Sequence, residues 1–321
     1  MIIVSGASGF IGSCLVSHLN SNWITDLILI DKFNNKEKLK NLQNKQYTSF
    51  IDRDDFKKFI KENNQKIDFF YHLGARTDTG ETDRTIFDKL NLNFSKEVWN
   101  FCCDNHIPLI YASSAATYGN GDLGFDDAHS ETANLTPLNE YASSKHTFDK
   151  WALEQRSHPP FWYGFKFFNV FGPNEYHKGR MASVILHAYH QLKKNGKIEL
   201  FKSHAEGIAD GEQKRDFIYI KDLLKVLDHF YTNKPQNGIY NLGSGKAHSF
   251  NELAFAAFNA LDINPKIEYI DTPEKYRKNY QYFTEAKIDK LRNAGYTNEF
   301  MSFESCVKEY VQEYLSMGKY L

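Results

Sequence analysis

The sequence predicts an α/β protein built on a doubly wound parallel sheet, followed by a smaller mixed α/β lobe. Three observations carry this prediction. In the N-terminal half, short apolar runs alternate with amphipathic segments, which is typical of parallel strands joined by helices. A glycine-rich turn directly follows the first apolar run. From about residue 172 the alternation fades, where Gly172-Pro173 breaks the chain.

The expected strands are apolar throughout, as strands covered on both faces of a sheet should be. In chain order they are residues 2–4, 27–30, 47–51, 69–72, 109–112 and 161–168. Helices fit between them at residues 10–20, 53–63 and 84–105, and a long helix starts near Glu140, just after Pro137. The Asn/Lys-rich stretch 34–45 is expected to be solvated surface.

The C-terminal half is expected to hold a helix at 180–194, a polar loop at 203–213 and an amphipathic helix near 303–317. The chain length of 321 residues favours two domains. We place the first at 1–171 and most of the second at 172–321. The chain partly returns to the first domain near 215–250.

Composition excludes several classes of function. A hydrophobic share of 41% and a net charge of −1 suit a soluble protein and provide no field for nucleic acid or anionic membrane. The first strand begins at Ile2, which leaves no room for a signal peptide, and no apolar run is long enough to span a bilayer. Four cysteines and twelve histidines show no metal-binding spacing, so we expect a cytoplasmic protein with reduced cysteines and no metal.

The segment Gly6-Ala-Ser-Gly9-Phe-Ile-Gly12 follows the first strand and opens a helix. Glycines at this spacing permit a tight turn and the close approach of a pyrophosphate to the helix N-terminus. Asp31 ends the second strand, where an acid would bind the adenine ribose. The two features together predict a dinucleotide-binding Rossmann domain.

These residues leave the choice between NAD and NADP open. Asp31 by itself favours NAD, because a carboxylate repels a 2′-phosphate. Lys32, Lys38 and Arg53 could neutralise both Asp31 and such a phosphate. The alternative is that all three are solvent-facing.

Tyr141 and Lys145 indicate the chemistry. They lie one helical turn apart and so share a face. The Lys ammonium is expected to lower the pKa of the tyrosine from about 10 toward neutrality, so that Tyr141 can take a proton from a sugar hydroxyl while a nicotinamide takes the hydride. Ser114 and Thr117, at the C-terminal end of a strand, are positioned to meet a substrate, and Ser114 would hydrogen-bond the reacting oxygen. The sequence therefore predicts an oxidoreductive enzyme.

This set resembles the extended short-chain dehydrogenase/reductases, whose members mostly act on nucleotide-linked sugars. The resemblance covers the whole chain and includes Asn169 in Phe168-Asn-Val-Phe-Gly-Pro173 and Arg215 in Arg215-Asp-Phe-Ile-Tyr219. It implies that Asn169 and Arg215 contact the diphosphate end of the substrate, which would occupy the C-terminal lobe. Arg215 is also a candidate phosphate fork on its own chemistry.

Further segments are similar to the ADP-glyceromanno-heptose 6-epimerase family. They are Ala112–Gly119, Glu175–Ser183, Tyr280–Thr284 and Leu291–Tyr296, with His177-Lys178-Gly179 the most specific part. The resemblance implies tightly held NADP, oxidation of the sugar at C6″ to a ketone and return of hydride to the opposite face. Such inversion needs an acid/base on each side of the carbon, and Lys178 fits the second role beside Tyr141.

The same resemblance implies further contacts. For the cofactor these are, besides the glycines and cations above, Phe10, Ile11, Leu73, Gly74, Ala75, Asn91, Lys145, Val170 and Lys178. For the nucleotide sugar they are Arg180, His187, Phe201 and Tyr280. The cofactor preference shifts toward NADP through Lys38 and Arg53. The implied partner is an ADP-linked heptose, the product would feed lipopolysaccharide inner-core synthesis in a Gram-negative cytosol, and the implied assembly is a homo-oligomer, a pentamer.

The chain departs from the family pattern at several places. Arg180, facing the substrate, stands where a small residue is expected, and Arg76-Thr-Asp-Thr79 replaces a more Ser-rich segment beside the nicotinamide. The loops at 120–136 and 203–213 are longer than usual. These departures leave the reaction type standing and the identity of the sugar and nucleotide open.

Three other functions compete. A nucleotide-sugar 4-epimerase needs one Tyr base and would make Lys178 dispensable. A 4,6-dehydratase needs an Asp-Glu pair near the position of Ala115-Ala116, and this chain lacks it. A cofactor-binding regulator without catalysis would not require Ser114, Tyr141 and Lys145 together.

Overall fold

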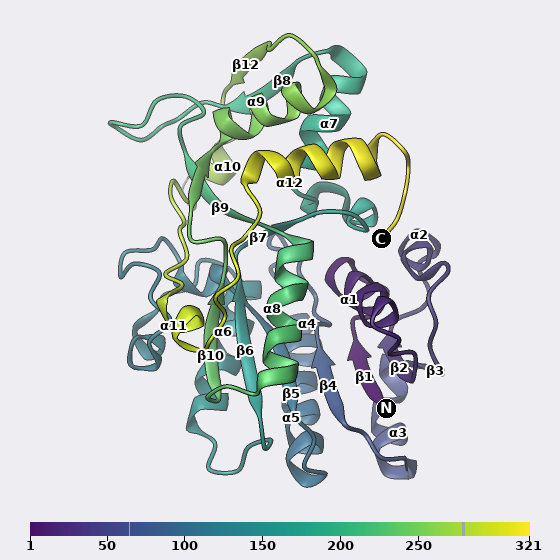
Figure 1. Ribbon diagram of the computed structural model, residues 1–321. Coiled ribbons are helices and arrows are strands. Elements are labelled where there is room, and N and C mark those ends of the chain that lie inside the picture. Colours follow the sequence, from purple (N-terminus) through teal and green to yellow (C-terminus); the bar gives the residue numbers. More distant parts are fainter. Residues whose placement is uncertain (64, 278–279) are drawn as a thin grey trace.

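The computed structural model describes residues 1–63, 65–277 and 280–321, with the backbone alone for 275 and 276. Its centre is a parallel sheet whose strands run, from one edge to the other, in the order β3, β2, β1, β4, β5, β6, β10 (Figure 1). Their bounds are Ser49–Asp52, Leu27–Asp31, Ile2–Ser5, Phe69–His72, Leu109–Ser114, Trp162–Phe167 and Gly238–Leu242. The strand order reverses between β1 and β4, so the crevice for a ligand opens at the carboxyl ends of these strands.

Helices cover both faces of this sheet. Ile3 packs with α3 (Phe56–Glu62), α5 (Phe94–Asp104) and α6 (Glu140–Glu154) on one face. Its neighbour Val4 packs with α1 (Phe10–Ser21) and α8 (Ile220–Asn233) on the other. Because successive strand residues point to opposite faces, both faces must be apolar, and the continuous apolar runs in the sequence follow from this.

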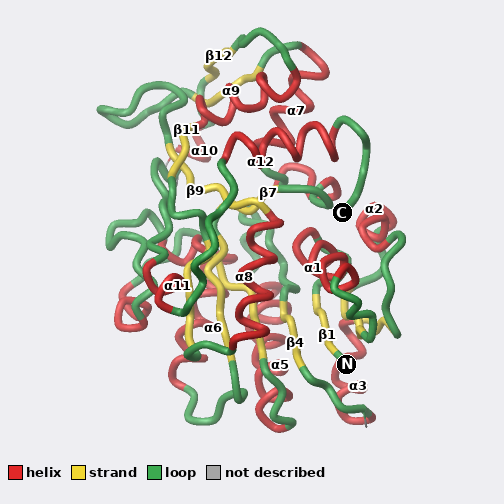
Figure 2. Tube along the Cα trace, in the orientation of Figure 1, coloured by secondary structure: helices red, strands yellow, loops and turns green. Residues whose placement is uncertain are grey.

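A smaller lobe lies beyond the carboxyl edge of the sheet (Figure 2). Among the described residues it holds a three-stranded sheet, in the order β11 (Ala247–Ser249), β9 (Lys214–Tyr219), β7 (Asn169–Phe171). It also holds a parallel pair, β12 (Ile267–Ile270) with β8 (Ile198–Phe201). Its helices are α7 (Val184–Asn195), α9 (Phe250–Leu261), α10 (Glu274–Arg277) and α12 (Phe303–Glu309). Short helices elsewhere are α2 (Lys36–Leu39), α4 (Arg84–Phe87) and α11 (Asp289–Asn293).

The elements agree with the sequence prediction except at β3, where Ser49 and Phe50 are exposed because the strand lies at the edge of the sheet, and at particular ends. β3 begins two residues later than expected, and β5 continues to Ser114. The expected helix at 84–105 is three pieces, because a π-helical turn at Asp88–Asn93 separates α4 from α5. The expected helix at 180–194 begins at Val184, because Ser183 caps it and Gly179 upstream has a φ of 53°. The division at residue 171 stays a prediction.

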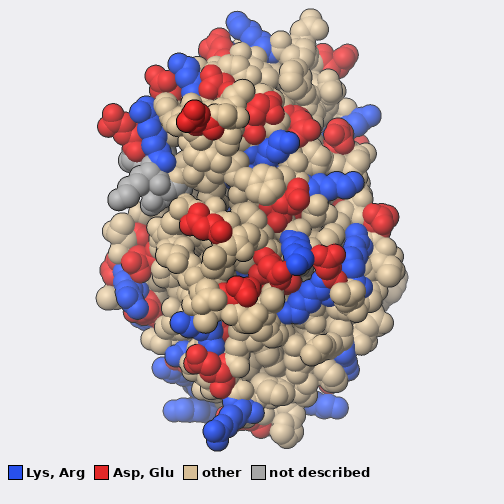
Figure 3. All heavy atoms as spheres, turned by 90° about the vertical axis from the view of Figure 1, so that its left-hand side faces the viewer, with Lys and Arg blue, Asp and Glu red and all other residues tan. Residues whose placement is uncertain are grey.

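The exposed surface mixes charges of both signs. In Figure 3 basic and acidic side chains alternate over the face in view, without a broad area of one sign. This agrees with a net charge of −1 for the chain. No helix in the described part of the chain is both long and apolar enough to cross a membrane.

A buried ion pair lies beneath the carboxyl edge of the sheet. Lys166 of β6 and Asp149 of α6 are 3.1 Å apart, with side-chain exposures of 1% and 0%. Asp149 also accepts hydrogen bonds from Ser113 at 2.6 Å and Tyr111 at 3.1 Å. Lys166 donates to Thr117 at 2.6 Å. The pair thus joins α6, β5 and β6 directly below the segment that carries Ser114.

We expect Lys166→Met to lower the free energy of unfolding by about 3–5 kcal/mol, because it leaves the Asp149 carboxylate buried and unpaired. Urea unfolding measures this loss. The matched control is Lys57→Met, whose pairing with Glu97 is exposed, and which should cost less than about 1 kcal/mol. The double change Lys166→Met/Asp149→Leu should recover part of the loss. Equal losses for Lys166→Met and the control Lys57→Met would contradict the prediction.

Candidate active site

Two glycine turns meet at the point where the strand order reverses. A Cβ built on Gly6, whose φ is +72°, would lie 2.6 Å from the Cα of Gly74, in the turn after β4. A Cβ on Gly12 would lie 2.2 Å from the carbonyl oxygen of Gly6. Side chains at these positions would force the turns apart. The first turn of α1 contains no acidic residue, and its N-cap Gly9 has no side chain to cover the free N–H groups.

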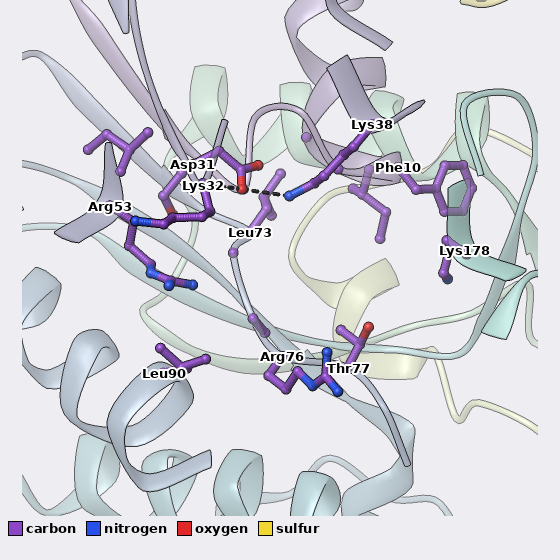
Figure 4. Close-up of a pocket in the computed structure, with 18 of the residues that line it drawn as sticks. Phe10, Asp31, Lys32, Lys38, Arg53, Leu73, Arg76, Thr77, Leu90 and Lys178 are labelled. Atoms are coloured by element: carbon purple, nitrogen blue, oxygen red, sulfur yellow. Dashed lines mark hydrogen bonds and ion pairs between the residues drawn. The ribbon is translucent and has the colours of Figure 1, made fainter. Parts of the chain in front are cut away.

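These turns form one wall of a cavity of about 410 Å³ (Figure 4). Most residues expected to bind the cofactor line it: Gly6, Gly9, Phe10, Ile11, Gly12, Asp31, Lys32, Lys38, Arg53, Leu73, Gly74, Ala75 and Lys178. Leu90 and Phe94 also line it and were not expected, whereas Arg76 and Thr77 belong to the segment expected beside the nicotinamide. His177, next to Lys178, lines the cavity too. The glycine cradle, the open helix terminus and the size of the cavity fit a dinucleotide.

At one end of the cavity the Asp31 carboxylate is already fully hydrogen-bonded by the protein. One oxygen accepts from the Ser8 amide at 3.0 Å and the Ser8 hydroxyl at 2.8 Å. The other accepts from the Lys32 amide at 2.7 Å and the Lys38 ammonium at 2.5 Å. Figure 4 shows Lys38 reaching Asp31, with Lys32 and Arg53 beside them. The hydrogen-bonding capacity of the Asp31 carboxylate is therefore used within the protein, and the Lys38 ammonium balances its charge.

Asn91 has a supporting place in the wall. It lies in the π-helical turn, and its side-chain oxygen accepts from the Arg76 amide at 2.8 Å. Its amide group donates to the Arg76 carbonyl at 3.0 Å and to Ser144 at 2.9 Å. Asn91 thus braces the turn after β4 against α6 from behind, and direct contact with a cofactor stays a prediction. Extra residues in π turns often occur at functional sites.

A second cavity, of about 280 Å³, adjoins the first and shares Phe10, Ile11, Leu73, Ala75 and Lys178 with it. Six residues that were expected to contact the cofactor or the substrate line this second cavity: Ser114, Tyr141, Lys145, Asn169, Val170 and Lys178. They come from β5, α6, β7 and the 3₁₀ turn Tyr176–Met181. Thr117, expected beside Ser114, is instead fully buried against Lys166.

The pair Tyr141 and Lys145 differs from expectation in its electrostatics. Asn139 caps α6 by accepting from the Ala142 amide at 2.9 Å, which sets the helix at the sheet edge. Lys145 donates to the Ala112 carbonyl at 2.7 Å, and burial lowers its pKa to about 8, with Asp149 opposing. Burial raises the pKa of Tyr141, while a hydrogen bond with Ser114 lowers it. The expected lowering of the Tyr141 pKa is therefore wrong for the protein groups alone, because burial of the phenolate is the largest effect and the nearby Asp149 charge adds to it.

Lys178 is held by a loop whose anchors were not expected from the sequence. The buried Glu175 carboxylate accepts from the Ser183 amide at 2.5 Å and hydroxyl at 2.6 Å, and from Tyr310 at 3.0 Å. Asn174, with a φ of +74°, donates to Ser13 of α1 at 3.0 Å. The Lys178 ammonium lies 5.4 Å from the centre of the Phe10 ring. Burial lowers the pKa of Lys178, although Glu175 opposes this, so a neutral amine is easier to reach.

The expected substrate residues fall into two groups. Arg215 is held between the rings of Tyr280 and Phe250, each centre 5.6 Å away, and donates to the Lys214 carbonyl at 2.9 Å and to the Gln281 carbonyl. Burial lowers the pKa of Arg215. Asn169 donates to the Asp216 carbonyl at 2.9 Å.

Only Asn169 of the first group lines one of the two cavities; Arg215, Tyr280 and the whole second group lie outside both linings. His187 on α7 and Phe201 at the end of β8 are half-buried there. Arg180 is 58% exposed and pairs with Asp78 across the mouth of the cleft that the two adjoining cavities form. The expectation that it faces the substrate does not agree with this placement.

The fold and the site together define an enzyme of the short-chain dehydrogenase/reductase type. Residues 2–243 match the NAD dependent epimerase/dehydratase family, and the chain belongs to this family.

The relatives narrow the family further. The chain is 48% identical over 326 residues to an ADP-L-glycero-D-manno-heptose-6-epimerase of Fusobacterium nucleatum, with 98% of each chain covered. The solved enzyme of that name from Helicobacter pylori superposes with a TM-score of 0.81 at 27% identity, covering 97% of this chain and 95% of that one. A UDP-N-acetylglucosamine 4-epimerase of Methanobrevibacter ruminantium shares the fold, with a TM-score of 0.81 at 23% identity over 98% of both chains. Within the family the chain therefore groups with the ADP-L-glycero-D-manno-heptose-6-epimerases.

We expect Lys145 to titrate near pH 8, and its ¹³C-methylated side chain, assigned by its loss in Lys145→Met, can be followed by NMR. The direction in which stability changes with pH follows from the lowered pKa of Lys145. Below about pH 8 the burial cost of the ammonium is fully present, and it is relieved as pH rises toward the unfolded value of 10.5. The wild-type protein should gain stability relative to Lys145→Met over this window, and titration near 10.5 would refute the assignment.

Proposed function

We propose that this protein is an ADP-L-glycero-D-manno-heptose 6-epimerase that inverts C6″ of ADP-D-glycero-D-manno-heptose. The observation that carries the proposal is that Tyr141 and Lys178, from two distant elements, line one cavity that adjoins the dinucleotide cavity. An inversion needs proton transfer on both faces of the reacting carbon, and a single tyrosine serves only one. The names of the relatives support the identity of the sugar.

The residues divide the work as follows. A bound NADP would accept and return the hydride, and its charged nicotinamide ring would favour the Tyr141 phenolate. Tyr141 takes the proton of the C6″ hydroxyl as that carbon loses hydride and becomes a ketone, while Ser114 hydrogen-bonds the oxygen. After hydride returns to the opposite face, Lys178 supplies the proton to the new hydroxyl. Lys145 keeps a positive charge beneath the site below about pH 8. Arg215 and Asn169 hold the diphosphate end.

The test is incubation of the purified protein with ADP-D-glycero-D-manno-heptose, without added cofactor, and resolution of the C6″ epimers by NMR. We expect an equilibrium mixture of the two epimers. Lys178→Ala should lower kcat by about 10²–10⁴-fold, because general acid/base groups contribute this much. Full C6″ inversion by Lys178→Ala would refute the role of Lys178 as second acid/base, and turnover of another nucleotide sugar without any C6″ inversion would favour the 4-epimerase alternative. Bound dinucleotide without turnover of any nucleotide sugar would indicate a non-catalytic regulator.

The cofactor in this proposal is NADP, with NAD as the alternative. The Asp31 carboxylate already accepts four hydrogen bonds from the protein, so it offers little to a ribose 2′-hydroxyl and little repulsion to a 2′-phosphate. Lys38 and Arg53 line the same end of the cavity and supply positive charge. Lys32 contributes less, because its ammonium is bonded to Asp52 at 3.1 Å and Asp54 at 2.6 Å.

Lys38→Met should weaken NADP binding by about tenfold or more and change NAD binding less, since it removes a charged partner of the 2′-phosphate and uncovers Asp31. Isothermal titration of both dinucleotides into protein stripped of its cofactor measures the ratio. Lys36→Met is the matched control, because Lys36 is exposed on the same short helix and lies outside the cavity lining. An unchanged NADP-to-NAD ratio in Lys38→Met would count against NADP.

Two further parts of the proposal concern the setting of the enzyme. We infer a cytoplasmic location, supported by four free cysteines among the described residues. We also infer that the protein is a homo-oligomer, and the family resemblance implies a pentamer. Analytical ultracentrifugation measures the assembly.

A further inference from the structure

The loop at residues 76–81 and the turn Tyr176–Met181 meet at the mouth of the cleft that the two adjoining cavities form. Arg180 follows Lys178 by two residues, and Asp78 belongs to the segment after β4 that lines the dinucleotide cavity. The guanidinium of Arg180 donates to the Asp78 carboxylate. The ion pair therefore joins the turn that carries Lys178 to the loop at residues 76–81.

The contact is broader than the ion pair. A Cβ on Gly80 would lie 2.8 Å from the Arg180 guanidinium, so the Gly80 backbone packs directly against it. Thr79 lies 3.8 Å from the Met181 sulfur through its hydroxyl. Thr79, Met181 and Lys178 all line the catalytic cavity, so the two loops meet at its rim.

Each side of the contact is prepared for it. On one side the Gly80 amide donates to Asp78 at 3.0 Å, and Arg76 lies 3.5 Å from Asp78 and 3.6 Å from Glu81. The Gly80 amide and then Arg180 lower the pKa of Asp78, which keeps it ionised. On the other side Gly179, with a φ of +53°, provides the backbone bend between Lys178 and Arg180, a conformation that residues with side chains rarely adopt.

We propose that the Asp78–Arg180 pair is a clamp that fixes the Lys178 turn over the dinucleotide and positions Lys178 for proton transfer. The clamp rests on the proposed function for the identity of the dinucleotide. Glu175 and Ser183 anchor both ends of the turn, and the clamp holds its middle to the opposite wall of the cleft. An epimerase must retain its reduced cofactor until the ketone has taken the hydride back, and a clamp at the mouth slows escape.

The test is a double-mutant cycle of Asp78→Asn and Arg180→Gln, in which Asn keeps the bond from the Gly80 amide. Hydrogen exchange of the Lys178 and Ala182 amides, which bond to Glu175 and Gly179, reports the turn without any substrate. NADPH fluorescence in a displacement experiment reports the release rate, and kcat and KM report the chemistry. An exposed pair of this kind carries effects of about two- to fivefold.

We expect each single variant to speed exchange of these amides and release of NADPH by about two- to fivefold and to lower kcat more than it raises KM. The double variant should be no worse than either single one, because one interaction has been removed in all three. The matched control is Arg84→Gln with Asp88→Asn, an exposed pair between α4 and the π-helical turn that does not span the cleft and should change none of these values.

Additive effects, or wild-type exchange in both single variants, would overturn the clamp. Faster exchange in both single variants without any turnover of the ADP-heptose by the wild type would retain the clamp and refute the proposed function instead.

Discussion

The site depends on the contact between the Gly6 turn and the Gly74 turn. These turns follow β1 and β4, the neighbouring parallel strands between which the strand order of the sheet reverses. A Cβ on Gly6 would collide with the Gly74 backbone, and a Cβ on Gly74 would lie 3.1 Å from the Gly6 amide nitrogen, so the backbones of two neighbouring strand ends touch. This contact allows α1 to begin at the floor of the crevice with its free N–H groups facing the cavity. Every later element is added around this fixed point: α6 brings Tyr141 and Lys145, and the chain beyond β7 brings Lys178.

Two buried carboxylates hold together the separate segments that form the catalytic cavity. Asp149 holds α6 to the ends of β5 and β6, and Glu175 holds the Lys178 turn to the cap of α7 and to Tyr310. A buried carboxylate is stable only with several donors, so each one fixes all its partners at once. The same desolvation lowers the pKa of Lys145 and Lys178 and raises that of Tyr141. Structural support and acid/base tuning thus have one physical source.

The sequence was sufficient for most of the sheet and for most of the residues that line the two cavities, because hydrophobic periodicity and glycine spacing are local signals. Gly6, Asp31, Tyr141 and Lys178 each belong to a short pattern with a definite mechanism. Anchors such as Asn41, Asn174 and Glu175 could not be found this way, since their partners lie more than a hundred residues away or in other elements. Asn41 falls in a stretch expected to be solvated and is buried against Ser8 and Asn174. The expected placement of the Arg180 side chain was wrong for the same reason, because its partner Asp78 comes near it only in the folded protein.

The π-helical turn at Asp88–Asn93 has a consequence for how this protein can tolerate insertions and deletions. A π turn is wider than an α turn and takes up one extra residue without turning the helical segments on either side of it. Removing a single residue here would therefore give an unbroken α-helix and keep Arg84–Phe87 and α5 in place, but it would shift residues of the turn itself by about 100° around the helix axis. Asn91 would then lose its register with Arg76 and Ser144. A length change that makes the helix more regular would thus dismantle the brace behind the cofactor wall, so this segment should conserve its length more strictly than its composition.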